Sequence, residues 1–257
     1  MILYDGPSLL TGEPIVAVAT GFADGPSRNA KTGPMVQTYI LLRDRSPVDA
    51  AQDGGDAAVC GDCAHRGVPG VRRRSCYVNV NWAALNIWRK ALAGRYPPMD
   101  AEAFNGQLVR LGAYGDPAAV PASVWLRITS WARGWTGYTH AWSDPRFQGL
   151  RYCCMASVDS VEEAVRAQEM GWRTFRVRRA GEELRRGADD AREVVCPASD
   201  EGRKRTTCAA CRVCDGRSRR RGPHVAILAH GPNAGIFENQ RVQLSLFRAP
   251  TILYTEE

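Results

Sequence analysis

Short apolar runs alternate with helical patterns along most of this chain, and this alternation limits the folds that it can adopt. Apolar runs rich in β-branched and aromatic residues predict strands, and apolar residues at three- and four-residue intervals predict helices. The predicted strands span residues 36–42, 107–114, 135–140, 152–158, 172–178, 194–196 and 225–230. The predicted helices span residues 82–93, 121–132 and 161–170. This order predicts an α/β fold with a mainly parallel sheet that forms a complete or partial TIM-type barrel.

The two ends of the chain differ from this central region. Residues 1–30 carry Gly- and Pro-rich turns and predict an N-terminal β-hairpin. Residues 31–232 are expected to form the barrel-like domain, which includes a Cys-rich, metal-binding segment at 196–214. Residues 233–257 form a C-terminal extension to which the sequence assigns no structure.

The composition is that of a globular protein in a reducing compartment. Of the 257 residues, 44% are hydrophobic and 24% are charged, which is ordinary for a chain with a sizeable core. No apolar run reaches the length of a membrane span, and the first residues lack the basic segment and continuous apolar run of a secretory signal. We therefore expect a cytoplasmic protein with no membrane partner, in which disulfides are rare.

Nine cysteines are present, and seven of them fall into two groups with short, ordered spacings, which in a reducing compartment is typical of metal ligands. The pattern C-x11-C-x2-C-x2-C is formed by Cys196, Cys208, Cys211 and Cys214. Four such thiolates suit either a tetrahedral zinc site or an iron–sulfur cluster, so we expect their sulfurs to converge on one point. Cys153 and Cys154 lie in an apolar run and are expected to be small buried hydrophobic residues.

A second pattern, C-x2-C-x12-C, contains only three cysteines, Cys60, Cys63 and Cys76. If His65 supplies a fourth ligand, the result is a structural zinc site. If the fourth position stays open, the loop can hold a catalytic cluster that a substrate reaches. In that case the three thiolates should face the barrel mouth near Asp116 and Tyr138.

Several polar residues directly follow predicted strands, where the chemistry of an α/β barrel takes place. Asp116 and Asp159 are candidate bases, although either can instead cap the helix that follows. His140 is a candidate acid–base or ligand, although a lone histidine is often only hydrogen-bonded. Lys31 stands beside Gly33 and suits an anionic cofactor group, but the glycine spacing of a P-loop is absent.

The formal net charge is +7, and the sequence pI is about 9.1. Short basic runs lie inside the cysteine-containing segments, at residues 72–74, 203–205 and 217–221. They predict attraction to a polyanion, with nucleic acid or a nucleotide as the partner. The alternative is a set of solvated loops.

Motifs spread over residues 29–231 together resemble an uncharacterised family of phage and prophage proteins. The matching stretches are Lys31-Thr-Gly-Pro-Met35, Cys60-Gly-Asp-Cys63, Ser75-Cys-Tyr77, Gly112-Ala-Tyr-Gly-Asp-Pro117, Gly137-Tyr-Thr-His140, Ala156-Ser-Val-Asp159 and Cys196-Pro-Ala-Ser199 leading to Cys208–Cys214. This resemblance implies the cytoplasm of a bacterial host and no particular reaction.

The plan of the chain also resembles radical S-adenosylmethionine enzymes. Three cysteines follow the first core strand, the glycine–acid turn of Gly115 and Asp116 follows the next strand, and four cysteines lie near the C-terminus. The usual signature of those enzymes is C-x3-C-x2-C, which differs from the spacing here. The resemblance implies iron–sulfur clusters and S-adenosylmethionine as cofactors.

A third resemblance is to the guanine transglycosylases, which are barrels with a zinc site of three cysteines and a histidine. It implies a zinc site made of Cys208, Cys211 and Cys214 with His230 or His224, although C-x-C is the expected first pair. Asp116 or Asp159 would then act as the nucleophile or base.

The sequence therefore favours an iron–sulfur, radical-SAM-like enzyme that modifies nucleic acid or a nucleotide. Asp116, His140 and Asp159 are its predicted catalytic residues, and Cys60, Cys63, Cys76 and Lys31 its predicted cofactor-binding residues. Two alternatives remain: a zinc-containing base-exchange barrel, and a zinc-stapled nucleic-acid-binding protein without catalysis.

Overall fold

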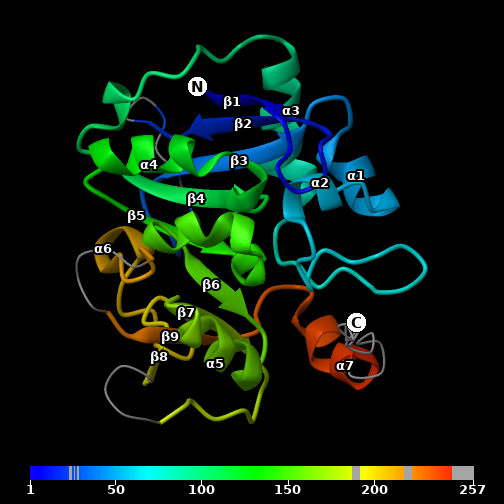
Figure 1. Ribbon diagram of the computed structural model, residues 1–257, viewed down its shortest axis with the longest axis vertical. Coiled ribbons are helices and arrows are strands. Elements are labelled where there is room, and N and C mark those ends of the chain that lie inside the picture. Colours follow the sequence, from blue (N-terminus) through cyan, green and yellow to red (C-terminus); the bar gives the residue numbers. More distant parts are fainter. Residues whose placement is uncertain (23–24, 26, 28, 187–191, 217–221, 245–257) are drawn as a thin grey trace, which may run out of the picture.

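A single mixed sheet forms the centre of the computed structural model, which describes residues 1–22, 25, 27, 29–186, 192–216 and 222–244. The described strands follow the order β1-β2-β3-β4-β5-β6-β7-β9-β8 (Figure 1). They are β1 (Ile2–Pro7), β2 (Pro14–Thr20), β3 (Val36–Leu42), β4 (Leu108–Tyr114), β5 (Gly134–Thr139), β6 (Met155–Val158), β7 (Thr174–Arg178), β8 (Glu193–Val195) and β9 (His224–Leu228).

Most neighbouring strands run parallel, as the sequence predicts. The pairs β1–β2 and β2–β3 are antiparallel, and every pair from β3 to β8 is parallel. The antiparallel pair β1–β2 confirms the predicted N-terminal β-hairpin, which joins the main sheet through β2. The observed fold is therefore α/β with a mostly parallel sheet.

The sheet is not closed, because β1 and β8 lie at its two edges. A complete barrel therefore does not form, and the barrel-like part of the prediction is not confirmed. The strands β3 to β7 are parallel, and their spatial order follows the chain order. Because they run in the same direction, their carboxyl ends all lie along the same edge of the sheet.

Helices pack beside the strands that they connect. The longer helices are α1 (Pro47–Asp53), α3 (Leu85–Leu92), α4 (Ala122–Trp131), α5 (Val161–Glu169) and α7 (Ala234–Leu244). The other helical segments are α2 (Ala57–Cys60), α6 (Cys208–Cys211), a π-helical turn η1 (Val80–Ala84), and the 3-10 helices η2 (Glu102–Phe104), η3 (Pro117–Ala119), η4 (Ala141–Ser143) and η5 (Pro145–Tyr152). In the described part of the chain, no helix has the length and apolar character needed to cross a membrane.

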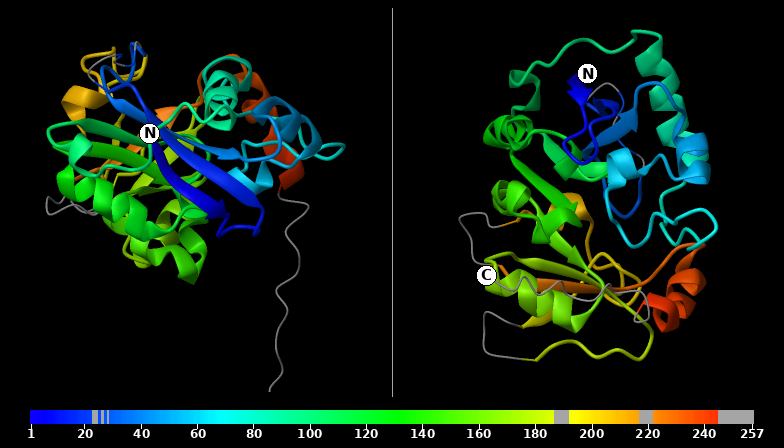
Figure 2. Two further views of the ribbon diagram at one scale, coloured as in Figure 1. Left: turned by 90° about the horizontal axis from the view of Figure 1, so that it is seen from above. Right: turned by 45° about the vertical axis from the view of Figure 1, so that its right-hand side comes forward.

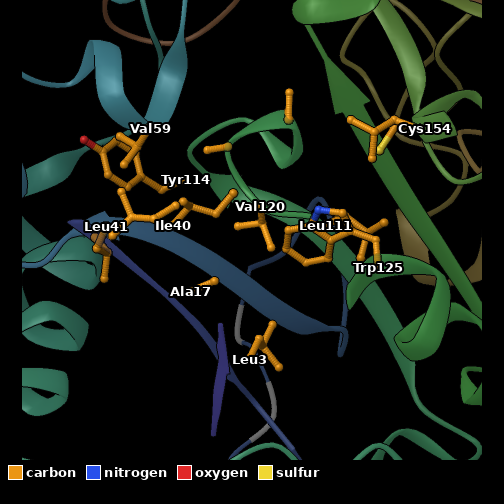
Figure 3. Close-up of a cluster of buried hydrophobic side chains, with 14 of the residues drawn as sticks. Leu3, Ala17, Ile40, Leu41, Val59, Leu111, Tyr114, Val120, Trp125 and Cys154 are labelled. Carbon is orange, nitrogen blue, oxygen red and sulfur yellow. The ribbon is translucent and has the colours of Figure 1, made fainter. Parts of the chain in front are cut away.

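The largest core lies between the N-terminal strands and the helices that cover them. Figure 3 shows Ile40, Leu111 and Trp125 in this cluster, with Val59 of α2 at its margin. Helices α1 and α2 contact β3, whereas α5 contacts β6 and β7. Burial of these apolar side chains fixes the strands, and so fixes the loops at their carboxyl ends.

Candidate functional site

A cavity of about 360 Å³ opens at the carboxyl ends of the parallel strands. The loops after β3, β4, β5, β8 and β9 all contribute to its wall, as expected for a ligand site in a parallel α/β fold. The predicted site residues in the wall are Lys31, Cys60, Cys63, Cys76, Asp116, His140, Cys196 and Cys208. Asp159, Cys211 and Cys214 lie outside the lining.

The first cysteine group, defined as Cys60, Cys63 and Cys76, lies on the loop after β3. Cys60 ends α2, and its carbonyl accepts a hydrogen bond of 3.2 Å from the Cys63 amide. The Cys76 amide donates to the carbonyl of His65 at 2.9 Å, which folds the loop back. Burial and then the neighbouring Cys63 raise the pKa of Cys60, with a further contribution from Cys76. The three thiols therefore lie close enough to interact electrostatically.

Buried ion pairs hold this loop in place. Asp56 has no exposed surface, and its carboxylate accepts from Arg66 at 3.2 Å and from Arg74 at 2.7 Å. Arg72 donates to the carbonyl of Cys63 at 3.3 Å. Arg72 and Arg74 of the basic run at residues 72–74 therefore bind groups of the protein itself.

The turn after β4 is pressed against the first cysteine group. Gly112 and Gly115 both have positive φ, and a Cβ on Gly115 would lie 2.7 Å from the Cβ of Ile40. The amide of Asp116 donates to the carbonyl of Val59 at 2.6 Å. A side chain at Gly112 would meet the Gly115 carbonyl oxygen and so distort the turn itself, whereas one at Gly115 would push the turn away from Ile40 and the Val59 carbonyl.

Asp116 joins this turn to the end of β5. Its carboxylate accepts from the Ala118 amide at 2.9 Å, the Thr139 hydroxyl at 2.7 Å and the His140 amide at 2.7 Å. The first of these bonds is the capping role that the sequence left open. The Asp116 carboxylate also lies 3.6 Å from Nδ1 of His140, so it fixes the position of that ring.

His140 lies against the first cysteine group, with Nε2 3.5 Å from the Cys63 sulfur. Burial lowers the pKa of His140, but Cys63 and Asp116 raise it more, and the net pKa is well above the ordinary value. Burial raises the pKa of Cys63, but His140 and His65 lower it more. The pair therefore favours a thiolate beside a protonated imidazole, and the thiolate is the form that binds metals.

His65 does not point a free ring nitrogen at the thiols. Its Nδ1 lies 3.0 Å from the Ser75 hydroxyl, and its Nε2 lies 3.0 Å from the Asp159 carboxylate. Helix α5 is capped by Ser160, which accepts from the Glu163 amide, so Asp159 is free to contact His65. As the side chains stand, His65 does not complete a four-ligand shell, and the first cysteine group faces the cavity.

The second cysteine group comprises Cys196, Cys208, Cys211 and Cys214. Cys196 follows β8, and α6 carries two members on a helix that Thr207 caps by accepting from the Ala210 amide. Burial raises the pKa of Cys214, and the other three thiols raise it further. The four thiols are thus neighbours. Among the described residues, no three His, Cys, Asp or Glu side chains are grouped tightly enough to hold an ion as they stand, so convergence on one point stays a prediction.

Arg173, only 8% exposed, fixes the loop that carries Cys214. Its guanidinium donates to the Asp215 carboxylate at 2.7 Å and to the carbonyls of Gly216 at 2.7 Å, Val213 at 2.6 Å and Pro223 at 2.9 Å. Only a planar guanidinium, with its several N–H donors, can reach these four acceptors at once. Arg173 is therefore a positioning residue for the second cysteine group.

The variant Arg173→Lys should lower the free energy of unfolding by about 2 kcal/mol, because a lysine cannot reach all four acceptors. If the second cysteine group binds a metal, the metal content should fall with it. Urea unfolding and metal analysis measure the two effects. Arg146→Lys, at an exposed pair with Asp144, is the control and should change neither quantity. Normal metal content in Arg173→Lys would contradict the positioning role.

The remaining predicted residues are distributed as follows. His224 lies in β9, where its Nδ1 accepts from the Thr174 amide at 3.0 Å, and it does not line the cavity. Cys153 and Cys154 have no exposed surface, which confirms that they are buried. In the basic run 203–205, Lys204 pairs with Asp200 at 2.6 Å. The run at 217–221 lies outside the described residues.

Two further residues of the cavity wall with polar side chains were not identified from the sequence. Arg110 lies on β4 and Tyr77 follows Cys76, and both line the cavity. A charged residue within an otherwise apolar strand is the signal that would have identified Arg110. The start of α7 also reaches the site, since Asn233 donates to the Cys76 carbonyl at 2.9 Å and the Phe237 ring lies 4.9 Å from that of His65. Figure 2 shows α7 beside the loop of the first cysteine group.

Comparison with known proteins gave no match to any protein-family model, to any curated protein or to any solved structure.

Proposed function

We propose that this protein is an iron–sulfur, radical-SAM-like enzyme that modifies nucleic acid or a nucleotide in a phage or prophage context. One observation carries the proposal. Members of both cysteine groups line a single cavity at the carboxyl ends of parallel strands. A substrate bound there would contact both groups at once, which a purely structural metal site does not require.

The first cysteine group offers three ligands for a cluster with one open position, and its thiols would have to move closer together to hold it, because no three such side chains among the described residues are grouped tightly enough as they stand. Three thiols supply three ligands, His65 is occupied by Ser75 and Asp159, and the remaining side of the group faces the cavity. When bound, such a cluster supplies the electron that cleaves S-adenosylmethionine and starts radical chemistry on a substrate. The four thiols of the second group fit a further cluster or zinc.

The chain's own residues would prepare this site. His140 stabilises the Cys63 thiolate, and Asp116 keeps the His140 ring in place. Tyr138, Phe175 and Phe237 place aromatic side chains in the wall of the cavity, where they would limit the contact of a bound substrate with water. The strands β3 to β7, parallel and in chain order, supply the scaffold that a partial barrel would need.

Anaerobic purification with analysis of iron, sulfide and zinc, together with a visible spectrum, tests the proposal. We expect a brown protein with iron and sulfide that bleaches on reduction. Reduced protein should also release 5′-deoxyadenosine from S-adenosylmethionine. A colourless protein that contains only zinc would contradict the proposal.

The contact between His140 and Cys63 favours a second candidate. A separation of 3.5 Å between Nε2 and the sulfur suits two ligands of one zinc ion. Cys60 and Cys76 would complete the shell after a rearrangement, since the described side chains are not grouped tightly enough for an ion as they stand. Asp116 would then be the carboxylate that orients the ligating histidine. Such a zinc centre suits a base-exchange enzyme or a nucleic-acid-binding protein, and zinc without iron in the same analysis would support it.

A further inference from the structure

Arg110 presents a positive charge to the cavity with an unused donor. Its Nη2 donates to the Tyr77 hydroxyl, whereas its buried Nε has no hydrogen-bond partner. Burial lowers its pKa, but Tyr77, Tyr138 and Cys208 raise it more, so the guanidinium stays charged. No carboxylate is among these three groups, although an arginine fork is well suited to bind an anion with two oxygens.

Lys31 brings a second positive charge to the same end of the cavity. Its side-chain nitrogen lies 2.8 Å from Nε2 of His230, a contact that supplies no negative charge. Burial lowers the pKa of Lys31 more than Cys196 and Cys208 raise it. The Asp200 carboxylate, which also acts on Lys31, is exposed and pairs with Lys204. Arg110 also acts on Lys31, and the two cations repel each other. Keeping two such charges in a partly buried wall is costly unless an anion lies between them.

Aromatic rings stand beside these cations. The rings of Tyr77 and His230 stack with centroids 5.3 Å apart, and those of Tyr138 and Phe175 lie 4.6 Å apart. All four residues line the cavity. Nucleobases stack on such rings, and a cavity of about 360 Å³ is of the size that binds small ligands.

The cations lie at the end of the cavity formed by the second cysteine group. The Lys31 carbonyl accepts from the Cys208 amide at 3.1 Å, and Cys208 is among the groups that act on both cations. Arg110 also reaches the first cysteine group, where S-adenosylmethionine would bind under the proposed function, because Tyr77 directly follows Cys76. An anion held by Lys31 and Arg110 would therefore belong to a substrate that lies between the two groups.

We propose that Lys31 and Arg110 form the phosphate-binding subsite of the substrate, and that the substrate is a nucleotide whose base contacts the neighbouring aromatic rings. This inference deepens the proposed function and rests on it for the reaction, but the binding itself needs neither a reduced cluster nor S-adenosylmethionine. Failure of one proposal is therefore distinguishable from failure of the other.

The test measures binding of deoxynucleoside 5′-monophosphates and of the matching nucleosides to the protein as purified, by calorimetry. Monophosphates should bind at least about tenfold more tightly than nucleosides, since each charge-assisted hydrogen bond contributes that much or more. Lys31→Gln and Arg110→Gln should each remove most of this preference. Lys90→Gln, on the exposed side of α3, is the matched control and should keep it.

Other outcomes would overturn the subsite. Equal binding of nucleosides and monophosphates, or a preference that survives in Lys31→Gln, would exclude a phosphate contact. Loss of metal from the second cysteine group in Lys31→Gln, with the phosphate preference unchanged, would show that the cations only balance the thiolates. Weaker binding of S-adenosylmethionine with unchanged monophosphate binding would assign the subsite to the cofactor.

A short single-stranded oligodeoxynucleotide that binds more tightly than the monophosphates would place the phosphate in a strand, and the reverse order would indicate a free nucleotide.

Discussion

Cys76→Ser is expected, under the proposed function, to abolish activity and to remove the cluster of the first cysteine group, while most of the fold survives. The thiol lines the cavity, and its loop lies outside the sheet that forms the core. The free energy of unfolding should therefore change by less than about 2 kcal/mol. Product formation, iron content and urea unfolding are the measurements. The second cysteine group should keep its own metal.

A structural zinc site predicts another result for the same variant. Metal binding would then supply local folding energy, and its loss would unfold the loop between residues 60 and 76. Hydrogen exchange and limited proteolysis of that loop distinguish the two cases. Cys154→Ala is the control, because Cys154 is a buried cysteine outside both groups and should keep metal and activity. Full metal content in Cys76→Ser would exclude this cysteine as a ligand.

The main strands were predictable because each is a short apolar run, and β3 begins and ends where the sequence places it. The face of the helix at residues 82–93 was only partly predictable. Its apolar stripe includes Trp82 and Leu92, yet these are 71% and 54% exposed, whereas Ile87 is buried. The predicted stripe also includes Leu85, which is half-buried, and Trp88, which packs against the core. Trp82 lies in the π-helical turn η1, which changes the residues per turn, so a regular helical period misplaces that residue.

The site was predictable only where residue type and strand position agree. Asp116 and His140 directly follow strands, and parallel strands bring their carboxyl ends together, so both line the cavity. Which partner each side chain takes depends on tertiary packing. His65 contacts Ser75 and Asp159, which lie in different parts of the chain, and no local spacing encodes that choice.

The second large effect is expected on stability, from Asp56→Ala. This carboxylate is fully buried and binds Arg66 and Arg74. Its burial raises its pKa more than the two arginines lower it, so its ionised form is costly to bury. Removing it nevertheless leaves two largely buried guanidinium groups without their partner. The free energy of unfolding should fall by about 3–5 kcal/mol.

Urea unfolding followed by circular dichroism measures this loss, and metal analysis shows its consequence for the site. Arg74 pairs with Asp56 and also interacts electrostatically with the thiols. Burial lowers the pKa of Arg74, but Cys76 and Cys60 raise it more. Without Asp56 the loop loses the bond that fixes this arginine, so metal content in the first cysteine group should fall as well. Asp53→Ala is the matched control, because Asp53 pairs with Arg45 at an exposed position and should change stability by less than about 1 kcal/mol. Equal losses in the two variants would show that the Asp56 pairs do not hold the loop.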